Sequence, residues 1–195
     1  MNTIVFYLVG LLAFSLALST ISVGRYKFLV KSVRIVVVLF SISFFGFWFS
    51  QKSINSFFEK SLSVQIVNRL NQPLDFYTIK VIDKNKNQYV TEHIGKIRPD
   101  YYQISYLDMA NSDEFWVSGF LGKKNLVYFS QHSVLKKIGD QKIEVRNYLN
   151  QSQKLSNLAE KKIEQLHQVN IGQSVWITLC LLLLYLNIVL LFRKK

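Results

Sequence analysis

Apolar residues are concentrated in three long runs, which are separated by one short basic segment and one long polar stretch. The runs cover residues 3–23, 35–50 and 175–192, and none of them contains Asp, Glu, Lys, Arg or His. As helices that rise 1.5 Å per residue they would be about 24–32 Å long, close to the ~30 Å hydrocarbon core of a bilayer. The pattern therefore predicts three transmembrane helices.

The first run has a second interpretation, a signal peptide that is cleaved near Ala17-Leu18-Ser19. Signal peptides begin with a positively charged segment. The first three residues of this chain carry no basic side chain, and basic residues follow the run instead. These features favour a helix that stays in the protein.

Between the second and third runs the sequence changes to short segments bounded by turn residues. Apolar and polar positions alternate within these segments, which is typical of β-strands with one buried face. Pro73 and the polar segment 83–88 mark two of the turns. We expect a small β-sandwich or barrel built from seven strands. The expected strands cover residues 63–70, 74–82, 89–94, 101–107, 114–120, 126–130 and 142–147.

Two of the expected strands show the alternation most clearly. Each places three aromatic or aliphatic residues on one face. These residues are Tyr77, Ile79 and Val81 in the strand 74–82, and Tyr102, Ile104 and Tyr106 in the strand 101–107.

The segment after the strands has a helical period. Leucine and isoleucine recur at near-helical spacing between Leu155 and Leu166, which predicts an amphipathic stalk helix with a break near Gly172. The expected fold class is therefore an α+β membrane protein with an extracytoplasmic all-β domain between its second and third transmembrane helices. Its expected parts are a helical hairpin (1–52, with a basic loop at 24–34), a connector and β domain (53–147), the stalk (148–173), and the third transmembrane helix with its tail (174–195).

Charge is distributed in a way that predicts the orientation. The net charge is +12, but all acidic residues lie between Glu59 and Glu164. Basic residues near the apolar runs mark the cytoplasmic side, whereas tryptophans such as Trp48 and Trp176 favour the interface. We therefore expect a plasma or inner membrane protein with its N-terminus outside and its C-terminus in the cytoplasm, and not a nucleic-acid-binding protein. The topology residues are Arg25, Lys27, Lys31, Arg34, Arg193, Lys194 and Lys195.

Small and polar residues within the runs are candidates for helix packing, because small side chains let helices approach closely in lipid. Two interpretations remain open for them: packing between the first two helices, or docking onto the helices of a partner. For Asn187 the alternatives are an interhelical hydrogen bond and a side chain that reaches toward the inner interface. The candidates are Ala13, Ala17, Ser43, Gly46, Ser50 and Asn187.

Residues with catalytic chemistry show no recognisable spacing. The three histidines, His93, His132 and His167, lie far apart, and the single cysteine, Cys180, lies inside an apolar run. No phosphate-binding loop, nucleophile elbow or metal-ligand spacing is present. We therefore expect no cofactor, no metal and no enzymatic activity.

These features favour a non-catalytic accessory or scaffolding subunit of a larger membrane complex, whose partners are other membrane or periplasmic proteins. The domain would contact them through an edge strand or a loop. The alternative is a membrane-anchored sensor or binding protein for a peptide, glycan or lipid. In that case Tyr101, Tyr102, Tyr106 and Trp116 are the residues expected to line the site.

Overall fold

The computed structural model describes residues 2–20, 26–58, 62–84, 86–122, 124–134 and 137–192. The chain divides into two compact units. The helical unit comprises Met1–Phe57 and Gln168–Lys195, and the β unit comprises Phe58–His167. The fold is α+β, and each unit is described by itself.

The β unit contains two sheets, and each of the seven predicted strands is present. A three-stranded sheet has the order β4-β1-β7, and a five-stranded sheet has the order β3-β2-β5-β6-β8. The two-residue strand β8 is too short for an alternating pattern to reveal it. The strands are β1 (Leu62–Asn68), β2 (Leu74–Asp83), β3 (Gln88–Ile97), β4 (Tyr102–Leu107), β5 (Glu114–Leu121), β6 (Asn125–Ser133), β7 (Gly139–Val145) and β8 (Leu149–Asn150).

One hydrophobic core contains residues from both sheets. Val64 and Ile66 of β1 belong to it together with Phe76 of β2 and Phe115 of β5, and all four side chains are fully buried. Gly119 of β5 has no room for a larger residue, because a Cβ there would lie 2.9 Å from the ring of Phe76. The alternation seen in the sequence thus gives each sheet one face for a shared core.

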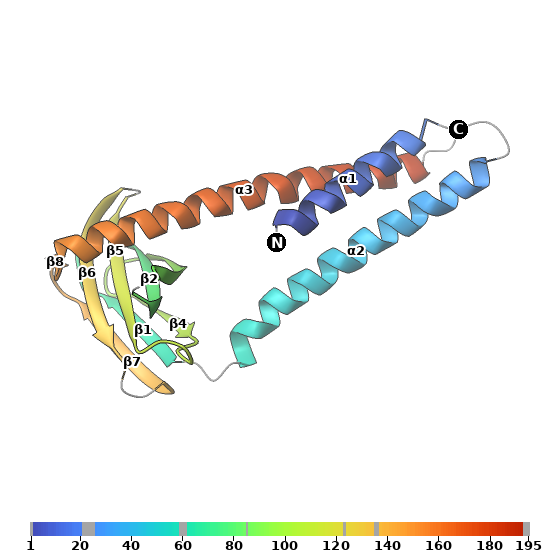
Figure 1. Ribbon diagram of the computed structural model, residues 1–195. Coiled ribbons are helices and arrows are strands. Elements are labelled where there is room, and N and C mark those ends of the chain that lie inside the picture. The colour runs from blue at the N-terminus through green and yellow to red at the C-terminus, as the bar shows by residue number, and fades with distance from the viewer. Residues whose placement is uncertain are drawn as a thin grey trace. The chain divides into compact units, whose positions relative to one another are not determined.

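A second core lies on the other face of the five-stranded sheet. Trp116 and Phe129 are buried there beside Ile79, and the first part of helix α3 (Gln153–Phe192) packs against them. Ala159 of α3 is fully buried in this contact, and its small side chain lets the helix approach the sheet closely. Figure 1 shows α3 beginning beside β8 and crossing β6 and β5.

Helix α3 is one continuous helix of 40 residues. The predicted break at Gly172 is therefore wrong: Gly172 lies inside the helix. A single glycine costs a helix only about 1 kcal/mol relative to alanine, and no proline interrupts the segment. At its start, the Ser152 hydroxyl accepts a hydrogen bond from the Leu155 amide at 3.4 Å, as an N-terminal cap does.

The helical unit contains α1 (Asn2–Leu18), α2 (Lys27–Phe58) and the second part of α3. Among the described residues, two helices are long and apolar enough to cross a bilayer, not the three that were predicted: residues 28–51 within α2, and α3. Helix α1 ends at Leu18, where the amides of the next two residues bond three residues back instead of four, and its 17 residues fall short of the predicted 21.

Helix α2 is longer than the predicted span. It includes residues 27–34, which were predicted as a loop, and residues 53–58, which were predicted as part of the connector. Residues 27–45 contain no glycine or proline, so nothing ends the helix within them. As a consequence, Lys31 and Arg34 lie within the apolar helical segment 28–51 and not in a loop.

The three helices of the helical unit share one apolar core. Leu12 of α1, Val38 of α2 and Leu184 of α3 are buried together in it. Phe6 contacts Trp176, and further along both helices α1 meets α3 again near Asn187, so these two helices run parallel.

Candidate functional site

The outer face of the three-stranded sheet carries an exposed aromatic row on β4. Tyr102, Ile104 and Tyr106 are 59%, 43% and 54% exposed. Ile104 and Tyr106 pair with Gln65 and Ser63 of β1, which are half-buried and do not belong to the core, so this row lies on the face away from the core. Tyr101, one residue before the strand, is 64% exposed. An apolar row of this kind is typical of a surface that contacts another molecule.

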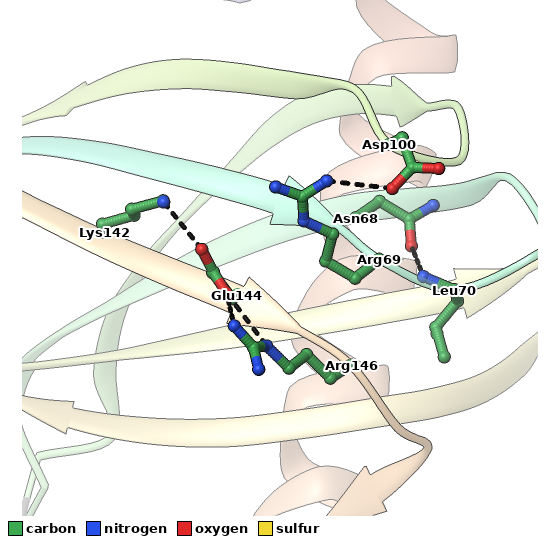
Figure 2. A network of polar contacts seen from close by, with 7 residues as sticks. All are labelled: Asn68, Arg69, Leu70, Asp100, Lys142, Glu144 and Arg146. Atoms are coloured by element: carbon green, nitrogen blue, oxygen red, sulfur yellow. Dashed lines mark hydrogen bonds and ion pairs between the residues drawn. The ribbon is translucent and has the colours of Figure 1, made fainter.

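The opposite edge of the same sheet is charged. Figure 2 shows Glu144 of β7 between Lys142 and Arg146, with the Lys142 Nζ at 2.6 Å and the Arg146 Nε at 2.9 Å from its carboxylate oxygens. These hydrogen bonds lower the pKa of Glu144 to about 2. Glu144 therefore stays ionised, and this edge carries a fixed charge pattern.

A polar network fixes the turn that leads into β4. The side chain of the buried Asn68 donates hydrogen bonds to two backbone carbonyls, and its oxygen accepts one from the Leu70 amide at 3.0 Å (Figure 2). Arg69 pairs with Asp100 at 2.9 Å. Asp100 has a φ of 60°, a conformation that side chains other than glycine rarely adopt, so these contacts hold a strained turn. They determine where β4 begins.

A second polar cluster joins the five-stranded sheet to α3. The Tyr77 hydroxyl donates to Asp75 at 3.0 Å, and the His167 Nε2 lies 3.1 Å from the same hydroxyl oxygen. Because a hydroxyl has only one proton to donate, His167 is the donor in the second bond. The His93 Nε2 lies 2.7 Å from Asp75, and its ring stacks on Tyr77. No pattern in the sequence predicts this cluster, since its members come from β2, β3 and α3.

The surroundings of Tyr77 keep its phenol hydroxyl protonated. Burial raises the pKa of Tyr77, and the hydrogen bond to Asp75 and the charge of Asp75 raise it further. The phenol therefore remains protonated and continues to donate to the carboxylate. The cluster links the sheet to the last turns of α3 that belong to the β unit.

Asn187 is the centre of a polar contact among the three helices of the helical unit. It is buried, its side-chain oxygen accepts a hydrogen bond from Ser15 at 2.9 Å, and its amide donates to the Leu12 carbonyl at 3.0 Å. Arg34 is also buried and donates to the Asn187 carbonyl at 3.4 Å. Of the two interpretations of Asn187, the structure shows the interhelical hydrogen bond.

The other predicted helix-packing residues lie on exposed faces of their helices. A Cβ added at Gly46 would meet no atom within 4 Å. The contacts among the helices use larger residues such as Leu8 and Leu12 instead. Among the described residues, the structure therefore does not place these small residues in the contact between the first two helices. The exposed residues are Ala13, Ala17, Ser43, Gly46 and Ser50.

The predicted topology and interface residues are only partly described. Arg25 and the tail Arg193-Lys194-Lys195 lie outside the described residues, and Lys27 is the first residue of α2. Lys31 is exposed. Trp48 and Trp176 are half-buried, and Trp176 contacts Phe6 edge to face with a ring separation of 5.5 Å.

The aromatic residues proposed for a ligand site are not brought together. Trp116 is buried beneath α3 on the five-stranded sheet, whereas the tyrosines are exposed on or beside β4 of the other sheet. In the part of the chain that the structure describes, no group of three His, Cys, Asp or Glu residues could hold a metal ion. The aromatic row on β4 is therefore the candidate functional surface of the β unit.

Comparison of the chain with protein-family models, with curated proteins and with solved structures found no match.

Proposed function

We propose that this chain is a non-catalytic accessory or scaffolding subunit of a membrane protein complex, which presents its β unit outside the membrane for contact with other proteins. The observation that carries the proposal is that one continuous helix, α3, belongs both to the β unit and to the helical unit. Its first part is the cover of the five-stranded sheet, and its second part is an apolar segment long enough to cross a bilayer. The β unit cannot separate from this segment without exposing its second core.

The length of α3 supports this role. A helix of 40 residues is about 60 Å long, roughly twice the thickness of the hydrocarbon core. Only its second half is needed to cross the membrane, so its first half is available as part of a domain in water. Ala159 and Ile163 in that first half are buried against the sheet.

The orientation in the proposal follows from charge. Basic residues near membrane segments favour the cytoplasm. Lys31 and Arg34 lie in the first turns of α2, and α3 leads into the basic tail. We therefore propose a plasma or inner membrane location in which the start of α2 and the C-terminus are cytoplasmic and the β unit is extracytoplasmic.

Two surfaces are proposed for partner contact. The first is the aromatic row of Tyr102, Ile104 and Tyr106, and the second is the small-residue face of α2 around Gly46. Exposed small residues favour close packing with a helix of another protein. A helix surface that only contacts lipid has no need of them.

Purification of the tagged chain in a mild detergent tests the proposal. We expect a stoichiometric membrane protein partner to be recovered with it. Gly46→Leu should reduce this recovery, because a Cβ at this position meets no atom of the described residues within 4 Å and we expect the added side chain to clash with a partner helix. Val36→Leu, at an apolar position of α2 that is 64% exposed, is the matched control and should leave recovery unchanged. A chain that purifies alone would contradict the proposal.

A further inference from the structure

Edge strands normally carry features that prevent pairing with another chain, such as charges, proline, bulges or short length. Three of the four described sheet edges have them. β7 carries Asp140, Lys142 and Glu144, β3 is interrupted by an irregular register, and β8 has two residues. β4 differs: it is six residues long, uncharged and without proline, and its pairing with β1 has no irregularity.

The sequence of β4 is also nearly symmetric about its third residue. Tyr102 and Tyr106 lie two residues on either side of Ile104, and the intervening positions are the polar residues Gln103 and Ser105. An antiparallel pair of identical strands is related by a two-fold axis. If that axis passes at Ile104, each tyrosine of one copy lies opposite a tyrosine of the other, and Ile104 lies opposite its own copy.

We propose that β4 pairs with β4 of a second copy of this chain, in antiparallel register centred on Ile104, so that two three-stranded sheets become one sheet of six strands. Cross-strand pairs of aromatic and β-branched residues stabilise such a contact, and backbone groups unpaired at a free edge find partners. No charged residue lies on β4, so no like charges are opposed within the strand.

The carboxylates that flank β4 fit this register. In it, Asp100 of one copy lies opposite Asp108 of the other. Each already has a cation of its own chain: Arg69 lies 2.9 Å from Asp100, and Lys80 lies 3.8 Å from Asp108. The strand ends therefore do not bring two unpaired negative charges together. This pairing does not depend on the accessory role proposed above.

Disulfide trapping in native membranes tests the pairing and its register. The native cysteine is buried and can be replaced first, as Cys180→Ala. Cβ atoms of directly opposed residues lie about 5 Å apart, within reach of a disulfide, whereas residues four positions out of register are about 13 Å apart. Ile104→Cys should therefore form a covalent dimer on mild oxidation.

The tyrosine positions make the test specific. Tyr102→Cys alone and Tyr106→Cys alone should form no disulfide-linked dimer, but the two variants expressed together with different tags should form a mixed disulfide-linked dimer. Val90→Cys, on the edge strand β3 and 39% exposed, is the control for random collision and should form no disulfide-linked dimer.

Three results would overturn the proposal. The first is a dimer of Val90→Cys as abundant as that of Ile104→Cys. The second is a dimer of Tyr102→Cys alone, which shows a different register. The third is an Ile104→Cys thiol that is shielded from maleimide in membranes yet forms no dimer, because a different chain then occupies the edge.

Discussion

The two sheets of the β unit present similar residues on their outer faces and use them differently. Tyr77, Ile79 and Val81 on β2 are at most 6% exposed, because α3 covers them. The row on β4 that begins with Tyr102 has the same alternation, but in the described part of the chain each of its members is at least 43% exposed. The comparison shows that alternation predicts an apolar face but does not say which part of the molecule covers that face. The uncovered face is the one available to other chains.

The largest expected effect on stability comes from disrupting the packing of α3 against the five-stranded sheet. Ala159→Asp would place a carboxylate without a partner in the contact between α3 and the sheet, and we expect it to destabilise the β unit by about 3–5 kcal/mol. Gln165→Asp puts the same residue on an exposed position of the same helix and should change stability by less than about 0.5 kcal/mol. Denaturant unfolding of the detergent-solubilised chain measures both; equal effects would show that α3 does not cover the sheet.

A matched pair of isoleucines compares the two faces directly. Ile79→Ala removes a fully buried side chain and should cost about 2–5 kcal/mol. Ile104→Ala removes the corresponding side chain from β4 and should cost the isolated chain less than about 0.5 kcal/mol. The same unfolding experiment distinguishes them. A large loss of stability for Ile104→Ala in the isolated chain would mean that its face is already covered.

A matched pair of tyrosines gives a smaller difference. Tyr77→Phe deletes the hydroxyl that donates to Asp75, and the expected cost is about 1–2 kcal/mol because the acceptor is a carboxylate. Tyr106→Phe should be neutral to folding, since this ring is exposed. Thermal unfolding of the two variants would show the difference, and an unchanged Tyr77→Phe midpoint would contradict the role of the cluster.

The smallest effect concerns the charged edge of the three-stranded sheet. The pKa of Glu144 is about 2 in the folded chain, below the value of about 4.3 for an unfolded glutamate. Its contribution to stability is therefore present above about pH 4.3 and is lost as the pH falls toward 2. Glu144→Gln should reduce the slope of stability against pH in that window only. If stability falls equally steeply with pH in the variant, the ionised Glu144 contributes no stability through Lys142 and Arg146.

The strands β1 to β7 could be predicted from the sequence because each has its own local signal. Alternation and turn residues such as Pro73 do not depend on the rest of the chain. Helix ends were predicted less well, since no local stop signal exists: α3 passes through Gly172, and α2 begins before the predicted span.

The site could be predicted only in part. The aromatic row on β4 was visible as a pattern, but its exposure depends on which sheet face α3 covers. The cluster around Asp75 was not predictable, because His93 and His167 reach it from distant elements. The sequence marks the small residues of the helices as candidates for packing. It does not predict that they are exposed, because the helices contact one another through larger residues such as Leu8 and Leu12.

The most direct test of the account is the accessibility of β4 in native membranes. Tyr106→Cys and Val90→Cys both place a thiol on an exposed strand position, and the native Cys180 is buried. We expect Tyr106→Cys to react slowly with a membrane-impermeant maleimide in native membranes and quickly after the complex is dissociated in detergent, whereas Val90→Cys reacts equally in both. Equal reactivity of Tyr106→Cys before and after dissociation would contradict the claim that the uncovered face is a contact surface.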